Sequence, residues 1–139
     1  MEKRVINTKL ENLRNCVARI ESKRPASSDL LEKDYDIQDI VSVNLERAIQ
    51  SCLDIAAHIG ADFDDVAGTS AAGAFQDLCK HGVISRELAD DLSRAAGFRN
   101  LLVHRYASID WGRVHQFIHS DLEILRRFAE AVAGYSQNN

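Results

Sequence analysis

Proline, glycine and cysteine are all scarce in this chain of 139 residues. With one proline, Pro25, and seven glycines, there are few positions at which a helix has to break or a tight turn has to form. No stretch alternates polar with apolar residues for long, so the sequence predicts that helices dominate and that strands are absent. The three cysteines are an odd number at wide spacing, which argues against both a disulfide framework and a zinc site. We expect three buried thiols, Cys16, Cys52 and Cys79.

Long apolar runs and a large net charge are missing too. No run approaches the roughly 18 uncharged apolar residues of a membrane span, and the first residues, Met1-Glu2-Lys3-Arg4, lack the apolar stretch of a secretion signal. The cytoplasm is therefore the expected location. The formal net charge is -4, so any binding of nucleic acid has to come from a local basic patch. The length fits a single domain, residues 1–139, because domains usually have about 100 to 200 residues.

Apolar residues recur three or four positions apart over most of the chain, a pattern typical of amphipathic helices. The first such segment covers residues 2–22 and is expected to end before Pro25. The second runs from about residue 34 to residue 59, and Gly60 suits its C-cap. These two segments predict the long helices of the fold.

The rest of the chain carries one loop and further helix caps. Residues 60–69 are acidic and contain glycine, and we expect them to form the main loop, from which Phe63 and Val66 dip into the core. Four residues are predicted to cap helices: Ser28 before the second helix, Ser70 for a third that runs through His81 and closes at Gly82, Ser85 for a fourth, and Asp110 for the last. The sequence therefore predicts an all-α, up-and-down bundle of four to five helices.

One segment of the fourth helix is unusual. Residues 97–106 contain an arginine, an asparagine, a histidine, a second arginine and a tyrosine, namely Arg99, Asn100, His104, Arg105 and Tyr106. From Arg94 through Ile109 there are three arginines and no aspartate or glutamate, in a protein whose net charge is negative. This is the local basic patch, and we take Arg94 and Arg105 as candidate contacts to RNA.

Helical geometry limits what this segment can do alone. Asn100 and His104 stand four apart and share a face, so the amide can bond one imidazole nitrogen and settle the tautomer. Arg99 lies five residues before His104, about 140° around the helix, so the two flank one wide surface and make a poor pocket by themselves. If two copies paired with these helices crossing at a two-fold axis, a cleft would hold two imidazoles and two guanidinium groups.

Such a cleft has the groups that cleave RNA. The reaction needs a base to activate the ribose 2′-hydroxyl, an acid for the leaving oxygen, and positive charge on the phosphate. Histidine and arginine supply all three without a metal ion, and RNA carries its own nucleophile. We therefore take Arg99 and His104 as catalytic, with Asn100 in support and with no metal or other cofactor.

The spacing from Arg99 to His104 and Tyr106 resembles the R-x4-H-x-Y signature of the HepT toxins, within the HEPN superfamily. The resemblance extends over most of the chain, through the stretches NLERAIQ at 44–50, LDIAAHI at 53–59 and IDW at 109–111. It implies a homodimeric endoribonuclease of HEPN-like fold, the toxin of a type II or type VII-like toxin–antitoxin module. It also implies a nucleotidyltransferase antitoxin as partner, which transfers AMP from ATP to Tyr106.

Other interpretations of the same residues remain open. The chain could be a non-catalytic helical binding module that docks a nucleotidyltransferase. Arg99 could be a surface charge paired with Glu87 or Asp91, and the ring of Tyr106 could lie under the last helix. No glycine-serine and paired-aspartate pattern of a nucleotidyltransferase occurs, which argues against an antitoxin.

The remaining histidines and the single tryptophan have structural explanations. His115 and His119 are spaced to chelate a metal, but no third ligand accompanies them in an HExxH-like pattern. His58 and His81 lie near helix ends, where a histidine can meet the last carbonyl groups. We expect Trp111 to be a core anchor.

Overall fold

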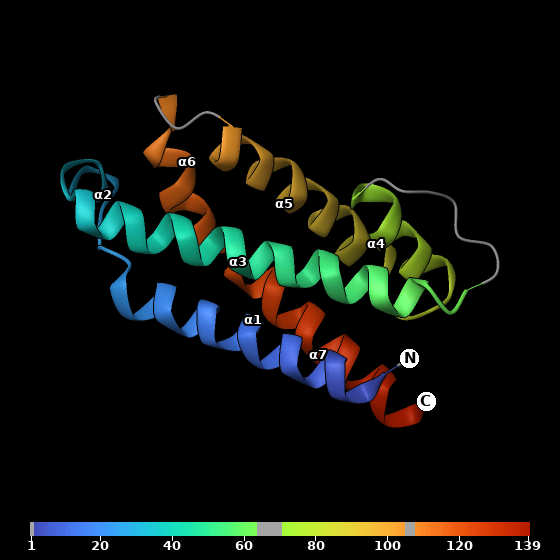
Figure 1. Ribbon diagram of the computed structural model, residues 1–139. Coiled ribbons are helices and arrows are strands. Elements are labelled where there is room, and N and C mark those ends of the chain that lie inside the picture. The colour runs from blue at the N-terminus through green and yellow to red at the C-terminus, as the bar shows by residue number, and fades with distance from the viewer. Residues whose placement is uncertain (1, 64–70, 105–107) are drawn as a thin grey trace.

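The prediction of an all-α bundle is confirmed. The computed structural model describes residues 2–63, 71–104 and 108–139, and within them there is no strand. Figure 1 shows long helices lying side by side, with α1 packed against α3 and α7, and α5 packed against α3, α4 and α7. The elements in chain order are α1 (Lys3–Lys23), α2 (Ser28–Lys33), α3 (Tyr35–Gly60), α4 (Ala71–Lys80), α5 (Arg86–His104), α6 (Trp111–Gln116), the π-helical turn η2 (Phe117–Asp121) and α7 (Leu122–Asn138).

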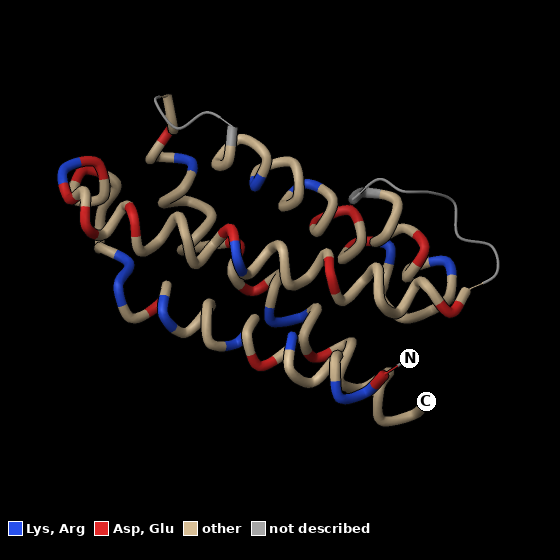
Figure 2. The backbone as a smooth tube through the Cα atoms, in the orientation of Figure 1, with Lys and Arg blue, Asp and Glu red and all other residues tan. Residues whose placement is uncertain are grey.

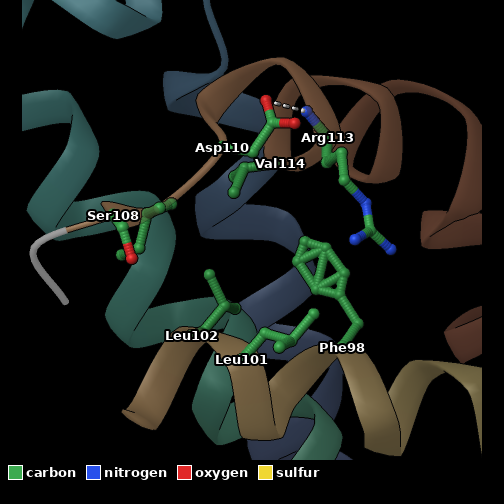
Figure 3. A pocket seen from close by; sticks show the side chains of 8 residues that line it. Phe98, Leu101, Leu102, Ser108, Asp110, Arg113 and Val114 are labelled. Carbon is green, nitrogen blue, oxygen red and sulfur yellow. Dashed lines mark hydrogen bonds between the residues drawn. The ribbon is translucent and has the colours of Figure 1, made fainter. Parts of the chain in front are cut away.

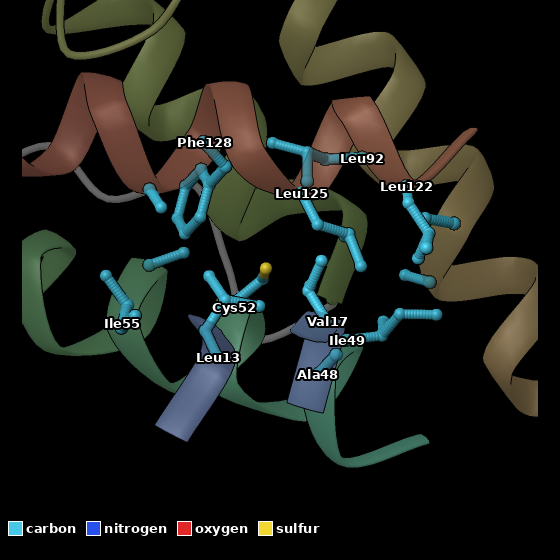
Figure 4. Close-up of a cluster of buried hydrophobic side chains, with 14 of the residues drawn as sticks. Leu13, Val17, Ala48, Ile49, Cys52, Ile55, Leu92, Leu122, Leu125 and Phe128 are labelled. Carbon is cyan, nitrogen blue, oxygen red and sulfur yellow. The ribbon is translucent and has the colours of Figure 1, made fainter. Parts of the chain in front are cut away.

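One apolar cluster fills the space between these helices. Figure 4 shows its centre, where side chains from α1, α3, α5 and α7 meet, among them Leu13, Cys52, Leu92 and Phe128. Cys52 is fully buried, as predicted, and burial raises the pKa of its thiol well above the usual range. Cys16 and Cys79 are only half-buried, and all three cysteines are free thiols.

Phe128 of α7 is a sensitive test of this packing. Its ring has no exposed surface and meets the ring of Phe75 edge-on, with centroids 5.8 Å apart. We expect Phe128→Ala to lower the free energy of unfolding by about 3 to 5 kcal/mol, because it removes buried surface and leaves a cavity. Denaturant unfolding would measure this change. The neighbouring Arg127→Ala, at an exposed position, is the control, and an equal effect of both variants would contradict the core described here.

Most of the predicted helix boundaries are confirmed by their caps. The Asp34 carboxylate accepts from the Ile37 N–H at 3.1 Å, and the Ser85 hydroxyl accepts from the Leu88 N–H at 3.1 Å. Gly82 closes α4 with φ +75°, a conformation that favours glycine. Each of these helices therefore begins or ends where the local chemistry placed it.

Two predicted caps are wrong by one residue. Ser27, not Ser28, caps α2 by accepting from the Leu30 N–H at 3.3 Å, and Ser28 is the first helical residue. Gly60 is the last residue of α3, and the C-cap is Ala61, whose φ of -62° keeps the chain right-handed and requires no glycine. Val66 and Ser70 fall outside the described residues.

The single last helix predicted from residue 111 is wrong as well, because α6 and α7 are separated by η2. In this turn the Arg24 side chain donates to the Ile118 carbonyl at 2.8 Å, and the His119 Nε2 donates to the Pro25 carbonyl at 2.8 Å. Contacts with the connection between α1 and α2 thus compensate the interrupted ladder of helical hydrogen bonds. Across the described residues, no helix is both long enough and apolar enough to cross a bilayer.

Candidate active site at the end of helix α5

Helix α5 divides into a buried face and a face that carries the polar residues of the motif. Leu92 and Leu102 are buried against the core, whereas Asn100 is exposed. Arg99, Asn100 and His104 all belong to α5, so the backbones of Asn100 and His104 are about one turn apart. The side chain of His104, and residues 105–107 with Arg105 and Tyr106, lie outside the described part of the chain.

Arg99 is half-buried, and its guanidinium group has no recorded ion-pair partner in the part of the chain that the structure describes. The side-chain Nε is buried without a hydrogen-bond partner, and no ion pair recorded between described residues involves Arg99. Asp91, one of the two partners considered for it, is paired with Arg94 instead. A buried donor without an acceptor is costly, so this guanidinium group is suited to an anionic ligand supplied from outside the described fold.

Arg94 contributes less positive charge than the sequence suggests. Its side chain is 71% exposed but is ion-paired with Asp91, one turn earlier on α5. Asp121 feels the charges of both Asp91 and Arg94. Burial and the negative charge of Asp91 raise the pKa of the Asp121 carboxyl, and the positive charge of Arg94 lowers it. Figure 2 shows that the acidic positions of α5 lie in its first half, so the basic character of the site is centred on Arg99.

The sequence interpretation missed Arg113 of α6. The Asp110 carboxylate caps this helix, as predicted, by accepting from the backbone N–H groups of Gly112 and Arg113 at 3.0 and 3.3 Å. The guanidinium carbon of Arg113 then lies 5.8 Å from the ring centre of Phe98 on α5, a cation–π arrangement. Arg113 therefore adds a cation beside the motif. The predicted cap fixed its place in α6, but only the fold places it against Phe98.

The histidines of α6 and η2 have a structural arrangement. The rings of His115 and His119 are tilted toward each other with centroids 4.3 Å apart, and His119 is held by Pro25. Within residues 2–63, 71–104 and 108–139, no three histidine, cysteine, aspartate or glutamate side chains are grouped so that they could hold a metal ion. Trp111 is partly buried against the core, as expected of an anchor.

Together these features define a class of protein, an all-helical bundle whose polar site consists of arginine, asparagine and histidine on one helix. The particular family follows from its sequence. Residues 13–132 match the Ribonuclease HepT-like family, and the chain belongs to that family.

Known relatives support this assignment along nearly the whole chain. The chain is 28% identical over 128 residues to the mRNA nuclease HepT of Shewanella oneidensis, covering 92% of this chain and 96% of that protein. It is 26% identical over 131 residues to the tRNA nuclease HepT of Aphanizomenon flos-aquae, covering 94% and 89%. Among solved structures, a tri-AMPylated HEPN toxin of Shewanella oneidensis in complex with MNT antitoxin is similar with a TM-score of 0.86, at 27% identity and with 96% of this chain and 99% of that chain covered.

Proposed function

We propose that this protein is the toxin of a toxin–antitoxin module, a cytoplasmic endoribonuclease that cleaves RNA without a metal ion. Residues 1–139 form one HEPN-like domain, and two copies form the active enzyme. The observation that carries the proposal is the unpaired, half-buried Arg99 within a chain of the Ribonuclease HepT-like family. The relatives of this chain include an mRNA nuclease and a tRNA nuclease.

Arg99 and His104 are the catalytic residues of this proposal. The imidazole of one His104 takes the proton from the ribose 2′-hydroxyl, whose oxygen attacks the adjacent phosphorus. The bond from phosphorus to the 5′-oxygen breaks, and the second His104 protonates that oxygen. The Arg99 guanidinium stabilises the negative charge on the phosphate oxygens during this step. The products are a 2′,3′-cyclic phosphate and a free 5′-hydroxyl.

The geometry of α5 is the reason for pairing two copies. A single helix places Arg99 and His104 on different sides of one surface, whereas a two-fold axis through this surface brings two of each together. The exposed amide of Asn100, one turn before His104, orients the imidazole. Arg94 and Arg105 contact the RNA backbone outside the cleft.

A nucleotidyltransferase antitoxin keeps this enzyme inactive. The Tyr106 hydroxyl attacks the α-phosphorus of ATP bound to the antitoxin, pyrophosphate leaves, and AMP stays on the tyrosine. The similar solved structure is a tri-AMPylated toxin in complex with MNT antitoxin, which supports this partner and this modification. Each added phosphodiester brings negative charge to a cationic site and fills space that RNA would occupy.

Cleavage of RNA in the presence of EDTA tests the proposal. We expect the purified chain to cut RNA equally well with and without the chelator, and to leave 2′,3′-cyclic phosphate ends. A substrate with a single 2′-deoxyribose at the cut position is expected to stay intact, because the nucleophile is missing. Loss of activity with EDTA, or cleavage of the deoxy-substituted substrate, would contradict the proposed mechanism.

A further inference from the structure

A small pocket lies between the end of α5 and the start of α6. It has a volume of about 180 Å³ and is lined by both apolar and charged side chains. Figure 3 shows Phe98, Leu101 and Leu102 of α5 on one side, with Asp110, the N-cap of α6, and Arg113 and Val114 of α6 facing them. Leu102 lies three residues after Arg99, and Leu101 lies three residues before His104, a spacing at which residues are neighbours on the surface of a helix. The pocket therefore lies at the end of α5 that carries the motif.

The chemistry of the walls suits a flat, polar-edged ring. The Phe98 ring and the Arg113 guanidinium group offer aromatic and cation–π surfaces on which a base can stack. No ion pair recorded between described residues involves Arg113. A cavity of about 150 Å³ accepts a benzene ring, so this pocket has room for one six-membered ring with its substituents.

Asp110 supplies the polar specificity. Its Oδ1 accepts the two backbone N–H groups that begin α6, and no hydrogen bond from a described residue to Oδ2 is recorded, so Oδ2 can accept one from a ligand. Asp110 is exposed and lines the pocket. A carboxylate in such a position accepts from the exocyclic amino group of cytosine, whereas the corresponding oxygen of uracil cannot donate.

We infer that this pocket binds one base of the substrate RNA, cytosine in preference to uracil, next to the cleaved phosphodiester. The inference rests on the proposed function, because it makes the pocket a subsite of the same RNA cleft. The base stacks against Phe98 and Arg113, and its amino group donates to Asp110. The ribose and phosphate then extend from the pocket mouth toward Arg99 and His104.

Nucleotide binding to the full-length protein tests the pocket directly. NMR titrations with CMP, UMP, AMP and ribose 5-phosphate would follow the methyl groups of Leu101, Leu102 and Val114. We expect CMP to shift these signals and to bind about tenfold more tightly than UMP, with ribose 5-phosphate weakest. Equal binding of CMP and ribose 5-phosphate, or no shift at the three methyl reporters, would overturn the inference.

Two variants separate the contributions of the walls. Arg113→Ala removes a stacking surface and is expected to weaken CMP binding about tenfold, whereas the exposed Arg127→Ala on α7 removes the same charge and leaves binding unchanged. Asp110→Asn keeps the cap of α6, because asparagine caps a helix as well as aspartate does. The variant lacks the carboxylate that accepts from the cytosine amino group, so we expect CMP and UMP to bind with similar affinity. Wild-type behaviour of both pocket variants would overturn the inference.

Cleavage of paired oligonucleotides that differ by one cytosine or uracil beside the cut links the pocket to the reaction. We expect a preference for cytosine at one position, which both pocket variants reduce. If the wild type cleaves no RNA, the proposed function fails while the NMR titration still decides the pocket. Selective binding of AMP, with cleavage indifferent to Arg113→Ala, would assign the pocket to the transferred adenylyl group and overturn its role in substrate binding.

Discussion

Replacing His104 by alanine is expected to abolish RNA cleavage and growth inhibition while leaving the protein folded and dimeric. His104 is the last residue of α5, beyond the buried Leu102, so its loss removes no side chain of the described core. General acid–base catalysis contributes about 10²- to 10⁴-fold, and in the proposed mechanism two imidazoles act on each phosphodiester. We expect the rate constant measured with an RNA substrate to fall by at least about 10³-fold.

Matched variants distinguish the loss of a catalytic imidazole from a general defect. His119→Gln changes an exposed histidine that contacts Pro25 and His115 in the structure, and it is expected to cleave RNA normally. Arg99→Lys keeps the charge but loses the planar fork of donors, so we expect it to fall between the wild type and Arg99→Ala. Toxicity that survives in a folded His104→Ala protein would show that this residue is not catalytic.

Replacing Tyr106 by phenylalanine is expected to produce a toxin that the antitoxin cannot silence. The variant lacks the hydroxyl that accepts AMP, so the arginine-rich site keeps its positive charge. In cells that also express the nucleotidyltransferase, we expect the wild-type chain to carry AMP on Tyr106 and to be harmless. The Tyr106→Phe chain is expected to remain unmodified and to stop growth, because the proposed cleavage step does not use the Tyr106 hydroxyl. Mass spectrometry of the purified proteins and growth curves measure both results.

Tyr35 provides the control for this experiment. Its side chain is 75% exposed near the start of α3, so an enzyme that modified any accessible tyrosine would also modify this one. We expect Tyr35→Phe to be neutralised like the wild type. An unmodified Tyr106 in a neutralised complex would contradict the proposed modification.

Apolar periodicity and helix-capping residues were enough to predict the long helices. The prediction failed where contacts between residues distant in sequence determine the structure. The apolar repeat placed the second long helix at about 34–59, and the structure has α3 at Tyr35–Gly60, because the buried stripe and the Asp34 cap act within a few residues. The same repeat gave no sign of η2. The Ile118 carbonyl of η2 accepts from the Arg24 side chain, and the His119 ring of η2 donates to the Pro25 carbonyl, and both partners are distant in sequence.

The candidate site was only partly visible in the sequence. The motif from Arg99 to His104 is local, and its helical placement follows from periodicity. That Asp91 pairs with Arg94 rather than Arg99 could have been expected from their spacing of three on one helix. The contact between Arg113 and Phe98 could not have been predicted from the sequence, because it depends on how α6 packs against α5.

The central claim, that two copies share one active site, is tested most directly by mixing active and inactive chains. Wild-type and His104→Ala chains would be unfolded together, refolded at a series of ratios, and assayed for RNA cleavage at constant total protein. If each cleft needs an imidazole from both copies, activity falls as the square of the wild-type fraction, to about one quarter in an equal mixture. A linear fall, to about one half, would show that each chain cleaves RNA alone and would contradict the shared site.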